Sequence, residues 1–573
     1  MRISKVEVSN FRNLDSITVQ CNPDANYIVG ENNIGKSNFL DLLNLIGNAW
    51  SFNDEDYKNR EMPIIVTISI RLDEYELGIF GDNFSPQDAS IINIKIIQEI
   101  KDARPIVVNA DTNEAMSQRD LHKINFLKYD TTRNPNSELR FDKNKGTGAF
   151  LGYIISKYIS EGDTFLEKEK VDSLLEFLNV HLLKIKAFKD FKINASFSQN
   201  NSDMLSRLIY LMDENSIPIS DTGNGVQFIV MAALNIFSRI LELYKSKLFD
   251  FEEYVLSRKD GKKILRLILA IDEPEVHLHP YMQRALLNYY KRILNNKDDD
   301  FLELLKFCFD IDGIDGQLLI VTHSTDALVD DHRNIIRFYR GTDGKISTVS
   351  GMELKINPDV EKHLIMHFPE AKEALYAKCT LIVEGETEYG CMKAFADSMH
   401  KPLDDYGICL VNARGEGTTP KLVQLFNHFK IPSVVIYDND VKQGKSPNEQ
   451  EFFTSGVCFE MDIVSTLITL GKHDLLKDIA LQLDNKANEY VLDLDFVKKP
   501  LDKIKYDLCK YQPKKLSELS EDEEDEYKAI YFAWYFKKKG TILGRIIGKS
   551  LDIDCIPKPY KDAITKSMEV AIL

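Results

Sequence analysis

The run Gly30-Glu31-Asn32-Asn33-Ile34-Gly35-Lys36-Ser37 is the feature that most restricts how this chain can fold. It fits the pattern G-x-x-x-x-G-K-S, it directly follows the apolar segment Tyr27-Ile28-Val29, and a helical pattern comes after it. A strand, a glycine-rich loop and a helix in this order form a phosphate-binding loop, in which Asn32 and Gly35 belong to the expected ATP contacts. Lys36 would reach the β- and γ-oxygens, and the Ser37 hydroxyl would ligate Mg²⁺. The sequence therefore predicts an α/β domain that binds ATP.

Two further apolar strands end in residues that suit ATP hydrolysis. Residues 264–271 are followed by Asp272 and Glu273, and residues 318–321 lead into Thr322-His323-Ser324. Ligands of α/β proteins bind at the carboxyl ends of the strands, so these side chains should meet the nucleotide. Asp272 would hold Mg²⁺ through water, and Glu273 would orient and deprotonate the attacking water. We expect His323 to sense the γ-phosphate.

A third segment, between these motifs, has two interpretations. Ser220-Asp221-Thr222-Gly223-Asn224-Gly225 precedes an apolar helix and resembles a degenerate ABC signature, in which Ser220, Gly223 and Gly225 would contact ATP. The same residues also suit an ordinary helix N-cap. The sequence leaves this choice open.

A second series of strands ends in carboxylates. The strand 381–383 is followed by Glu384, and a turn at Gly385 starts a helix that carries Glu388. The strand 434–437 leads into Asp438-Asn439-Asp440, whose period of two aims both aspartates to one side. Burying such carboxylates without partners is costly, so we expect a divalent cation, and oxygen ligands favour Mg²⁺ or Mn²⁺.

The length of 573 residues requires several folding units. We predict an ATPase domain over residues 1–350 that contains a helical insertion at about 150–215, and we expect this insertion to take part in dimerisation. A linker over 351–375 and a second α/β domain with a helical C-terminal extension over 376–573, which contains the carboxylate strands, complete the chain.

Composition limits the setting in which this chain can work. Lys and Arg total 72 against 89 for Asp and Glu, a net charge of −17, so contact with nucleic acid must be local or bridged by metal. No apolar run is long enough for a membrane helix, and the charged N-terminal residues do not fit a secretory signal. We therefore expect a cytoplasmic protein without membrane partners.

The motifs of residues 1–350 resemble the ABC-type ATPases related to SMC and RecF. The resemblance rests on Phe11-Arg12-Asn13, the loop 30–37, Asp272-Glu273-Pro274-Glu275 and Thr322-His323-Ser324. In that family ATP lies between the Walker motifs of one subunit and the signature of another. The resemblance therefore implies a homodimer or a higher even oligomer. It does not extend to the rod of SMC proteins, because the sequence has no long heptad segment.

The carboxylate strands resemble a Toprim domain, and an ABC ATPase followed by Toprim is the arrangement of the OLD (overcoming lysogenization defect) family of nucleases. That resemblance implies two metal ions held by Glu384, Glu388, Asp438, Asp440 and either Glu460 or Asp462. It also implies a catalytic lysine near the C-terminus, and Lys539 in the run Lys537-Lys538-Lys539-Gly540 is the best match. A solvated surface pair with the neighbouring acidic run is the other interpretation of these lysines.

The leading hypothesis is an ATP-regulated, metal-dependent endonuclease that cleaves or nicks DNA as the effector of an anti-phage system. A partner protein or nucleic acid encoded nearby would belong to that system. Two alternatives remain open: a Toprim RNase that cleaves tRNA, and a DNA-repair ATPase of RecF type whose Toprim fold is only structural.

Overall fold

The computed structural model divides into two compact units, Met1–Met352 and Glu353–Leu573, which are described separately. The structure describes the whole chain except residues 50, 103, 130–145, 159–167, 198–208, 247–250, 277, 329–331, 342, 356–368, 416, 440–447 and 573. Within these described ranges, no helix has the length and apolar character needed to cross a membrane.

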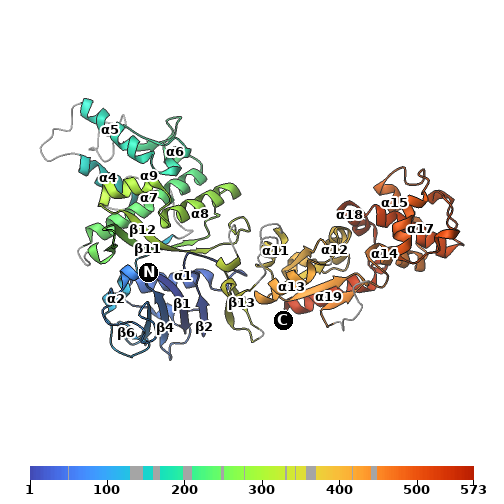
Figure 1. The fold of residues 1–573 in the computed structure, drawn as a ribbon, viewed down its shortest axis with the longest axis horizontal. Helices are drawn as coiled ribbons and strands as arrows, with labels where there is room; N and C mark the ends of the chain where they lie inside the picture. The colour runs from blue at the N-terminus through green and yellow to red at the C-terminus, as the bar shows by residue number, and fades with distance from the viewer. Residues whose placement is uncertain are drawn as a thin grey trace. The chain divides into compact units, whose positions relative to one another are not determined.

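The first unit is built around a seven-stranded sheet that carries the ATP motifs (Figure 1). Its strand order is β10-β11-β12-β3-β13-β14, and β7 pairs with β11 off this path. The four central strands are parallel to one another, and the strands at the two ends are antiparallel to their neighbours. The strands are β3 (Ala25–Gly30), β7 (Phe126–Tyr129), β10 (Val255–Ser257), β11 (Lys263–Asp272), β12 (Gly313–Val321), β13 (Ile335–Arg340) and β14 (Ile346–Ser350).

Apolar runs explain why the central strands of this sheet are buried. In β11 every residue after Lys263 is buried, as expected for a parallel strand covered on both faces. The strands are connected through helices α1 (Lys36–Asn48), α2 (Gln118–His122), α7 (Asn224–Lys245), α8 (Pro280–Leu294) and α9 (Asp299–Phe309). This arrangement brings the carboxyl ends of β3, β11 and β12 to one edge, where the ATP motifs lie.

A second, five-stranded antiparallel sheet belongs to the same unit, in the order β2-β1-β4-β5-β6. Two Ile-rich segments pair in this sheet, since Ile64 of β4 lies opposite Gln98 of β5 in an antiparallel ladder. Alternate residues of β4 are buried, and one hydrophobic core joins this sheet to α1 and the central strands. The strands are β1 (Arg2–Ser9), β2 (Ile17–Gln20), β4 (Ile64–Arg71), β5 (Ile91–Gln98) and β6 (Ile106–Asn109).

The segment predicted as a helical insertion contains both helices and a strand pair. Phe150 of α4 stacks on Phe237 of α7 with ring centroids 4.9 Å apart, so the insertion packs on the ATPase helices. Two short strands in its second half form an antiparallel pair that the helical periodicity did not indicate. The elements are α4 (Gly146–Tyr158), α5 (Lys168–Leu182), α6 (Lys186–Asp190), β8 (Asn194–Phe197) and β9 (Ile209–Met212).

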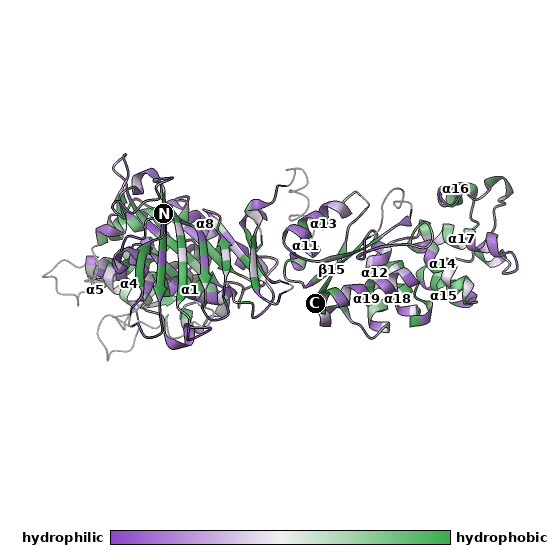
Figure 2. Cartoon of the chain, turned by 90° about the horizontal axis from the view of Figure 1, so that it is seen from below, coloured by the Kyte–Doolittle hydropathy of each residue, from purple (hydrophilic) through white to green (hydrophobic). Residues whose placement is uncertain are grey.

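The second unit contains a four-stranded parallel sheet in the order β16-β15-β17-β18, with helices on both faces. Figure 2 shows α11 and α13 on one side of β15, with α12 and α19 on the other. The strands are β15 (Cys379–Val383), β16 (Ile408–Asn412), β17 (Ser433–Tyr437) and β18 (Glu451–Phe453). The helices next to them are α11 (Pro369–Ala374), α12 (Glu386–Ser398), α13 (Thr419–His428) and α19 (Lys558–Ile572).

The C-terminal helices extend the core of this sheet. A single hydrophobic cluster includes residues of β15, of the fully buried Trp534 region and of the last helix, so the tail folds with the Toprim-like sheet. The remaining helices are α14 (Phe459–Thr469), α15 (His473–Leu483), α16 (Leu494–Lys503), α17 (Glu524–Lys537) and α18 (Thr541–Ser550). The acidic run before and at the start of α17 is largely exposed, as expected for a solvated helix start.

Candidate functional site

The phosphate-binding loop begins and ends on glycines with backbone angles that other residues rarely adopt. Gly30 has φ +137°, and a Cβ atom there would lie 2.2 Å from the backbone oxygen of Phe338. Gly35 has φ +96° and is the N-cap of α1. The first glycine allows β3 to pass close to β13, and the second turns the chain into the helix, which leaves the backbone N–H groups of the loop available to phosphate.

Lys36 is buried under this loop. Its Nζ donates to the carbonyl oxygens of Gly30 at 2.9 Å and Glu31 at 2.6 Å. Burial lowers the pKa of Lys36 to about 8, although the nearby carboxylates Glu273 and Asp272 act in the opposite direction. The ammonium is therefore held inside the loop by backbone oxygens, where a phosphate could replace them.

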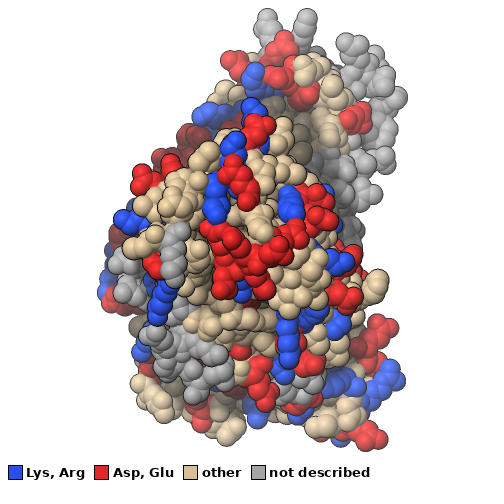
Figure 3. Space-filling model, turned by 90° about the vertical axis from the view of Figure 1, so that its right-hand side faces the viewer, with Lys and Arg blue, Asp and Glu red and all other residues tan. Residues whose placement is uncertain are grey.

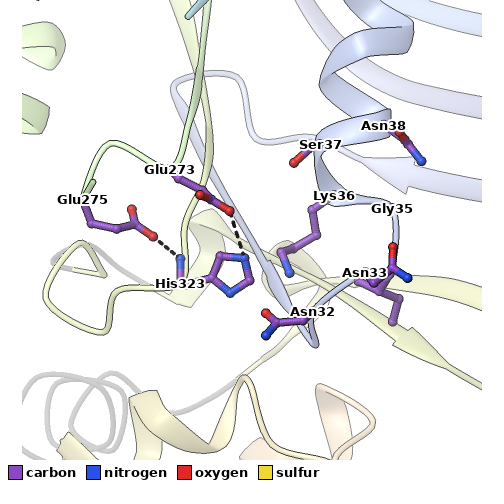
Figure 4. A pocket seen from close by; sticks show the side chains of 10 residues that line it. Asn32, Asn33, Gly35, Lys36, Ser37, Asn38, Glu273, Glu275 and His323 are labelled. Carbon is purple, nitrogen blue, oxygen red and sulfur yellow. Dashed lines mark hydrogen bonds and ion pairs between the residues drawn. The ribbon is translucent and has the colours of Figure 1, made fainter. Parts of the chain in front are cut away.

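The two carboxylates at the carboxyl end of β11 take different positions, Asp272 as the last residue of the strand and Glu273 directly after it. The Ser37 hydroxyl donates to Asp272 Oδ1 at 3.1 Å, and Asp272 is only 8% exposed. This pair suits a Mg²⁺ ion bound to phosphate oxygens. Glu273 adopts the left-handed conformation with φ +47°, which is strained for a residue with a side chain. Its carboxylate Oε1 lies 3.5 Å from Nε2 of His323 (Figure 4).

Glu275 is a member of this site to which the sequence analysis gave no role. Its carboxylate accepts hydrogen bonds from the His323 backbone N–H and from the Thr322 hydroxyl, so it holds the end of β12 in place. Burial raises the pKa of Glu275, whereas burial and the positive charge of Lys36 lower the pKa of His323. The signal in the sequence was the repeated acid of Asp272-Glu273-Pro274-Glu275.

These residues line one pocket of about 550 Å³. Figure 4 shows Lys36, Glu273 and His323 around the same space, with Asn32 and Ser37 at its border. The lining residues are Asn32, Asn33, Ile34, Gly35, Lys36, Ser37, Asn38, Glu273, Glu275 and His323.

The predicted signature segment is elsewhere in the described structure. Gly223 is the N-cap of α7, and it is not among the residues that line the ATP pocket. Ser220 lies in the middle of the short 3-10 turn Ile219–Asp221, and Gly225 lies in the first turn of α7. The side-chain surroundings of these two positions are outside what the structure describes. One copy of the chain thus does not bring Gly223 to its own Walker pocket.

In the second unit, Glu384 and Glu388 lie where β15 turns into α12. The Gly385 N–H donates to Glu388 Oε2 at 2.7 Å, and the Asp438 N–H donates to Glu384 Oε2 at 3.2 Å. The structure therefore joins the ends of β15 and β17 through a carboxylate. Glu388 is 2% exposed, and its Oε1 has no hydrogen-bond partner among the described residues.

Negative charge is concentrated around this buried carboxylate. Burial raises the pKa of Glu388 well above its usual value, and the charges of Asp438, Glu460 and Glu384 raise it further. Neighbouring carboxylates that disfavour ionisation in this way are typical of a site built for a cation. The predicted metal residues Glu384, Glu388 and Asp438 thus lie together.

The sequence left open whether Glu460 or Asp462 joins this group. Glu460 lines a pocket of the second unit that also contains Glu384, Glu388 and Asp438. Its carboxylate oxygens accept hydrogen bonds from the Thr387 hydroxyl at 2.9 Å and from the Cys458 thiol at 3.3 Å. Asp462 instead accepts the backbone N–H groups of Ser455 at 2.9 Å and Gly456 at 2.5 Å. Glu460 therefore lies in the carboxylate pocket, whereas Asp462 fixes the loop before α14.

Basic side chains border the same pocket, whose volume is about 380 Å³. Lys539 lines it together with Arg414 and Lys503, two positions that the sequence analysis did not select. No motif marks the last two, since each depends on which helix or loop packs beside the carboxylates. The described lining also includes Glu384, Gly385, Glu386, Thr387, Glu388, Asp438, Cys458, Phe459, Glu460, Phe536 and Gly540.

The pocket has the donor chemistry for Mg²⁺ or Mn²⁺. Within the described ranges, no three His, Cys, Asp or Glu side chains are already close enough to hold a metal ion by themselves. Asp440, the second aspartate of the predicted pair, lies outside the described residues. The observation that supports a cation is the buried Glu388 Oε1, which has no partner within its carboxylate surroundings.

Comparison with protein families matches both units. Residues 1–151 and 154–327 match the family described as AAA ATPase domain. Residues 375–440 match the family described as overcoming lysogenization defect protein-like, TOPRIM domain. The second match ends at Asp440, so it covers the strands that carry Glu384 and Asp438.

Individual relatives are more distant. The DNA replication and repair protein RecF of Staphylococcus aureus strain JH9 is 34% identical over 58 residues, which are 10% of this chain and 16% of RecF, so the match spans about a sixth of that relative's length. Among solved structures, an SMC head bound to the C-winged helix domain of ScpA covers 61% of this chain and 97% of its own, at 14% identity and a TM-score of 0.36. The C-terminal region of the Xanthomonas campestris pv. campestris OLD protein covers 35% of this chain and 96% of its own, at 17% identity and a TM-score of 0.24.

Proposed function

The chain belongs to the AAA ATPase domain family and joins this ATPase to a Toprim domain of the overcoming lysogenization defect type, and on that premise we propose that it is an ATP-regulated, divalent-metal-dependent endonuclease that cleaves or nicks DNA. The observation that carries the proposal is the pocket in which the carboxylates Glu384, Glu388 and Asp438 lie beside Lys539. Carboxylates that bind metal, together with a nearby cation, are the groups that phosphodiester hydrolysis requires.

The residues of the second unit would share the work of hydrolysis. Glu384, Glu388, Asp438 and Glu460 would hold the metal, which would supply charge neutralisation and an acidic bound water. Glu384 also accepts a hydrogen bond from the Asp438 N–H. This bond holds the ends of β15 and β17 together beside the place where the reacting phosphate would bind. Lys539 would balance the negative charge that develops on the phosphate oxygens.

The residues of the first unit would bind and hydrolyse ATP. Lys36 would exchange the Gly30 and Glu31 carbonyls for β- and γ-oxygens, and Ser37 and Asp272 would hold Mg²⁺. Glu273 would orient and deprotonate the attacking water. Because His323 lies 3.5 Å from Glu273, it would detect the γ-phosphate next to that base.

A homodimer or a higher even oligomer would complete this ATP site. Gly223 does not line the pocket that contains Lys36 in the same chain, so a signature function for this segment needs a second copy. Bound ATP would then control the association of the two subunits. We propose that this control, rather than movement along DNA, is the purpose of hydrolysis, and that the activity serves an anti-phage system with a partner encoded nearby.

The direct test uses the purified full chain with supercoiled plasmid and, separately, total tRNA, in Mg²⁺ or Mn²⁺ and with or without ATP. Nicked or linear plasmid that forms only with metal supports the proposal. Intact plasmid with fragmented tRNA would replace it with an RNase, and no cleavage of either substrate would contradict a nuclease. Plaque counts on cells that express the wild type or Asp438→Ala then test the defence role, because only the wild type should reduce them.

A DNA-repair ATPase with a structural Toprim is the second candidate, and the similarity to RecF favours it. That similarity covers 10% of this chain. It accounts for a shared ATPase but not for the carboxylates around Glu388. Binding of DNA ends without any cleavage would be the result that favours this candidate.

A further inference from the structure

Two lysines of the nuclease pocket contact the same aromatic ring. Lys503 Nζ lies 5.6 Å from the centroid of Phe536, and Lys539 Nζ lies 4.7 Å from it. All three residues line the pocket that contains Glu384 and Asp438. Lys503 is the last residue of α16, Phe536 lies in the last turn of α17, and Lys539 follows that helix, so the packing of two helices creates this cluster.

The neighbouring lysines show that this placement is specific. Lys537 contacts the ring of Phe496 at 5.8 Å, and Lys538 pairs with Asp484 at 3.3 Å, but neither lines the pocket. Within the run 537–539, Lys539 is therefore the lysine directed to the carboxylates. The ring of Phe536 attracts both ammonium groups and fixes their positions.

The charges at this corner of the pocket are poised for an anion. Lys503 Nζ lies 4.0 Å from Asp438 Oδ2, at the limit of an ion pair, and its side chain is 28% exposed. Two ammonium groups near one ring repel each other, and because both lysines line the pocket, an oxyanion bound there would relieve that repulsion. A phosphate at this place would also lie beside the metal-binding carboxylates.

Overall charge makes a local cation pair necessary for DNA binding. The net charge is −17, and Figure 3 shows acidic side chains gathered near the centre of one face. Affinity for a nucleic acid backbone comes mainly from Lys and Arg contacts to phosphates. The pocket must therefore bring its own cations.

We propose that Lys503 and Lys539 together bind a backbone phosphate of the DNA strand, and that Phe536 is the positioning residue that holds both lysines at the carboxylates. This inference rests on the proposed nuclease function and adds to it a role for Lys503 and Phe536. Lys503 exchanges its weak contact with Asp438 for the phosphate when DNA enters. The Asp438 carboxylate then binds the metal ion.

The phosphate-binding role of the two lysines is tested by measuring the affinity of the full chain for a fluorescein-labelled DNA duplex at several salt concentrations. Ca²⁺ replaces Mg²⁺ in these measurements to limit cleavage. Lys503→Ala should weaken binding roughly tenfold at about 0.1 M salt and reduce the slope of log affinity against log salt by about 0.9, the effect of one lost phosphate contact. Lys503→Arg should restore the slope. Phe536→Ala should reduce the slope although it removes no charge, whereas a purely structural role would change the melting temperature alone.

Lys537→Ala is the matched control, because it removes a lysine with a ring contact outside the pocket. Its salt slope should equal that of the wild type. An unchanged slope and affinity for Lys503→Ala, with cleavage by the wild type intact, would overturn the inference and leave the nuclease proposal standing. Failure of the wild type to bind or cleave DNA would overturn both, and the same probe made of RNA shows whether the lysines serve that backbone instead.

Discussion

The Thr387 hydroxyl accepts a hydrogen bond from the Gly540 N–H at 3.1 Å and donates to Glu460 Oε1 at 2.9 Å. One side chain thus connects the turn that carries Lys539 to a pocket carboxylate. Close packing of α12 and α18 makes this possible, since a Cβ atom on Gly544 would lie 2.0 Å from the Thr387 backbone oxygen. Thr387 therefore sets the distance between the predicted catalytic lysine and the acidic cluster.

Thr387→Val tests this link. The substitution keeps the volume but removes both hydrogen bonds, so we expect a loss of about 1–2 kcal/mol in unfolding free energy. The cleavage rate should fall by roughly tenfold or more, because Lys539 and Glu460 are no longer held together. Thr380→Val is the control, since Thr380 is also buried and its hydroxyl bonds to Ser433, away from the pocket. Equal cleavage rates for the two variants would contradict the role of Thr387 in holding Lys539 and Glu460 together.

Removal of the metal ligands should separate the two activities. Asp438→Ala with Asp440→Ala should abolish plasmid cleavage and leave ATP hydrolysis at the wild-type rate, because the two sites lie in separate units. Chelation of divalent ions before substrate is added should stop cleavage by the wild type. Nicking by the double variant at the wild-type rate would refute the assignment of cleavage to the Toprim carboxylates.

Two substitutions in the ATP site distinguish ATP as a switch from ATP as a fuel. Glu273→Gln keeps nucleotide binding but removes the base, whereas Lys36→Ala removes a phosphate-binding charge. If bound ATP closes the dimer over the carboxylate pocket, Glu273→Gln should cleave poorly at millimolar ATP, and Lys36→Ala should cleave without regard to ATP. Cleavage assays at several ATP concentrations measure this. Loss of cleavage in both variants would instead indicate that hydrolysis loads the DNA.

ATP binding should take up a proton in mildly alkaline solution. Burial lowers the pKa of Lys36 to about 8 in the free protein, so above this pH much of the lysine is neutral. The phosphates favour the ammonium form and raise the pKa in the complex, so affinity should fall as pH rises through about 8. Calorimetry at about pH 8.5 in two buffers of different ionisation enthalpy measures the uptake. Lys36→Arg stays charged and should show none of it.

The protein should not exist as a stable monomer at working concentration. Gly223 does not line the Lys36 pocket of its own chain, so if its segment acts as a signature, a second copy must complete the ATP site. Light scattering should therefore give at least twice the chain mass of 65.7 kDa. A mass of one chain in the presence of Mg²⁺ and ATP would contradict this arrangement.

The sequence by itself determined the parts of this protein whose chemistry follows from position along a strand. The order of apolar strand, turn and helix placed Lys36 and Ser37 in the first turn of α1, directly after the phosphate-binding loop, and Glu384 at the end of β15. A carboxyl end of a parallel strand has a fixed place at the sheet edge, so the residues just after it can be assigned without coordinates. The fold class of both units followed from the same pattern.

Only the tertiary structure decided which distant side chains join these edges. Glu460 and Asp462 are two residues apart in one helical turn, yet Glu460 faces Thr387 and Asp462 caps backbone N–H groups. Lys503 reaches the pocket because α16 packs beside α17, and no motif records that contact. Such placements depend on how helices pack against one another, and side-chain directions at the end of a helix change with every small rotation of it.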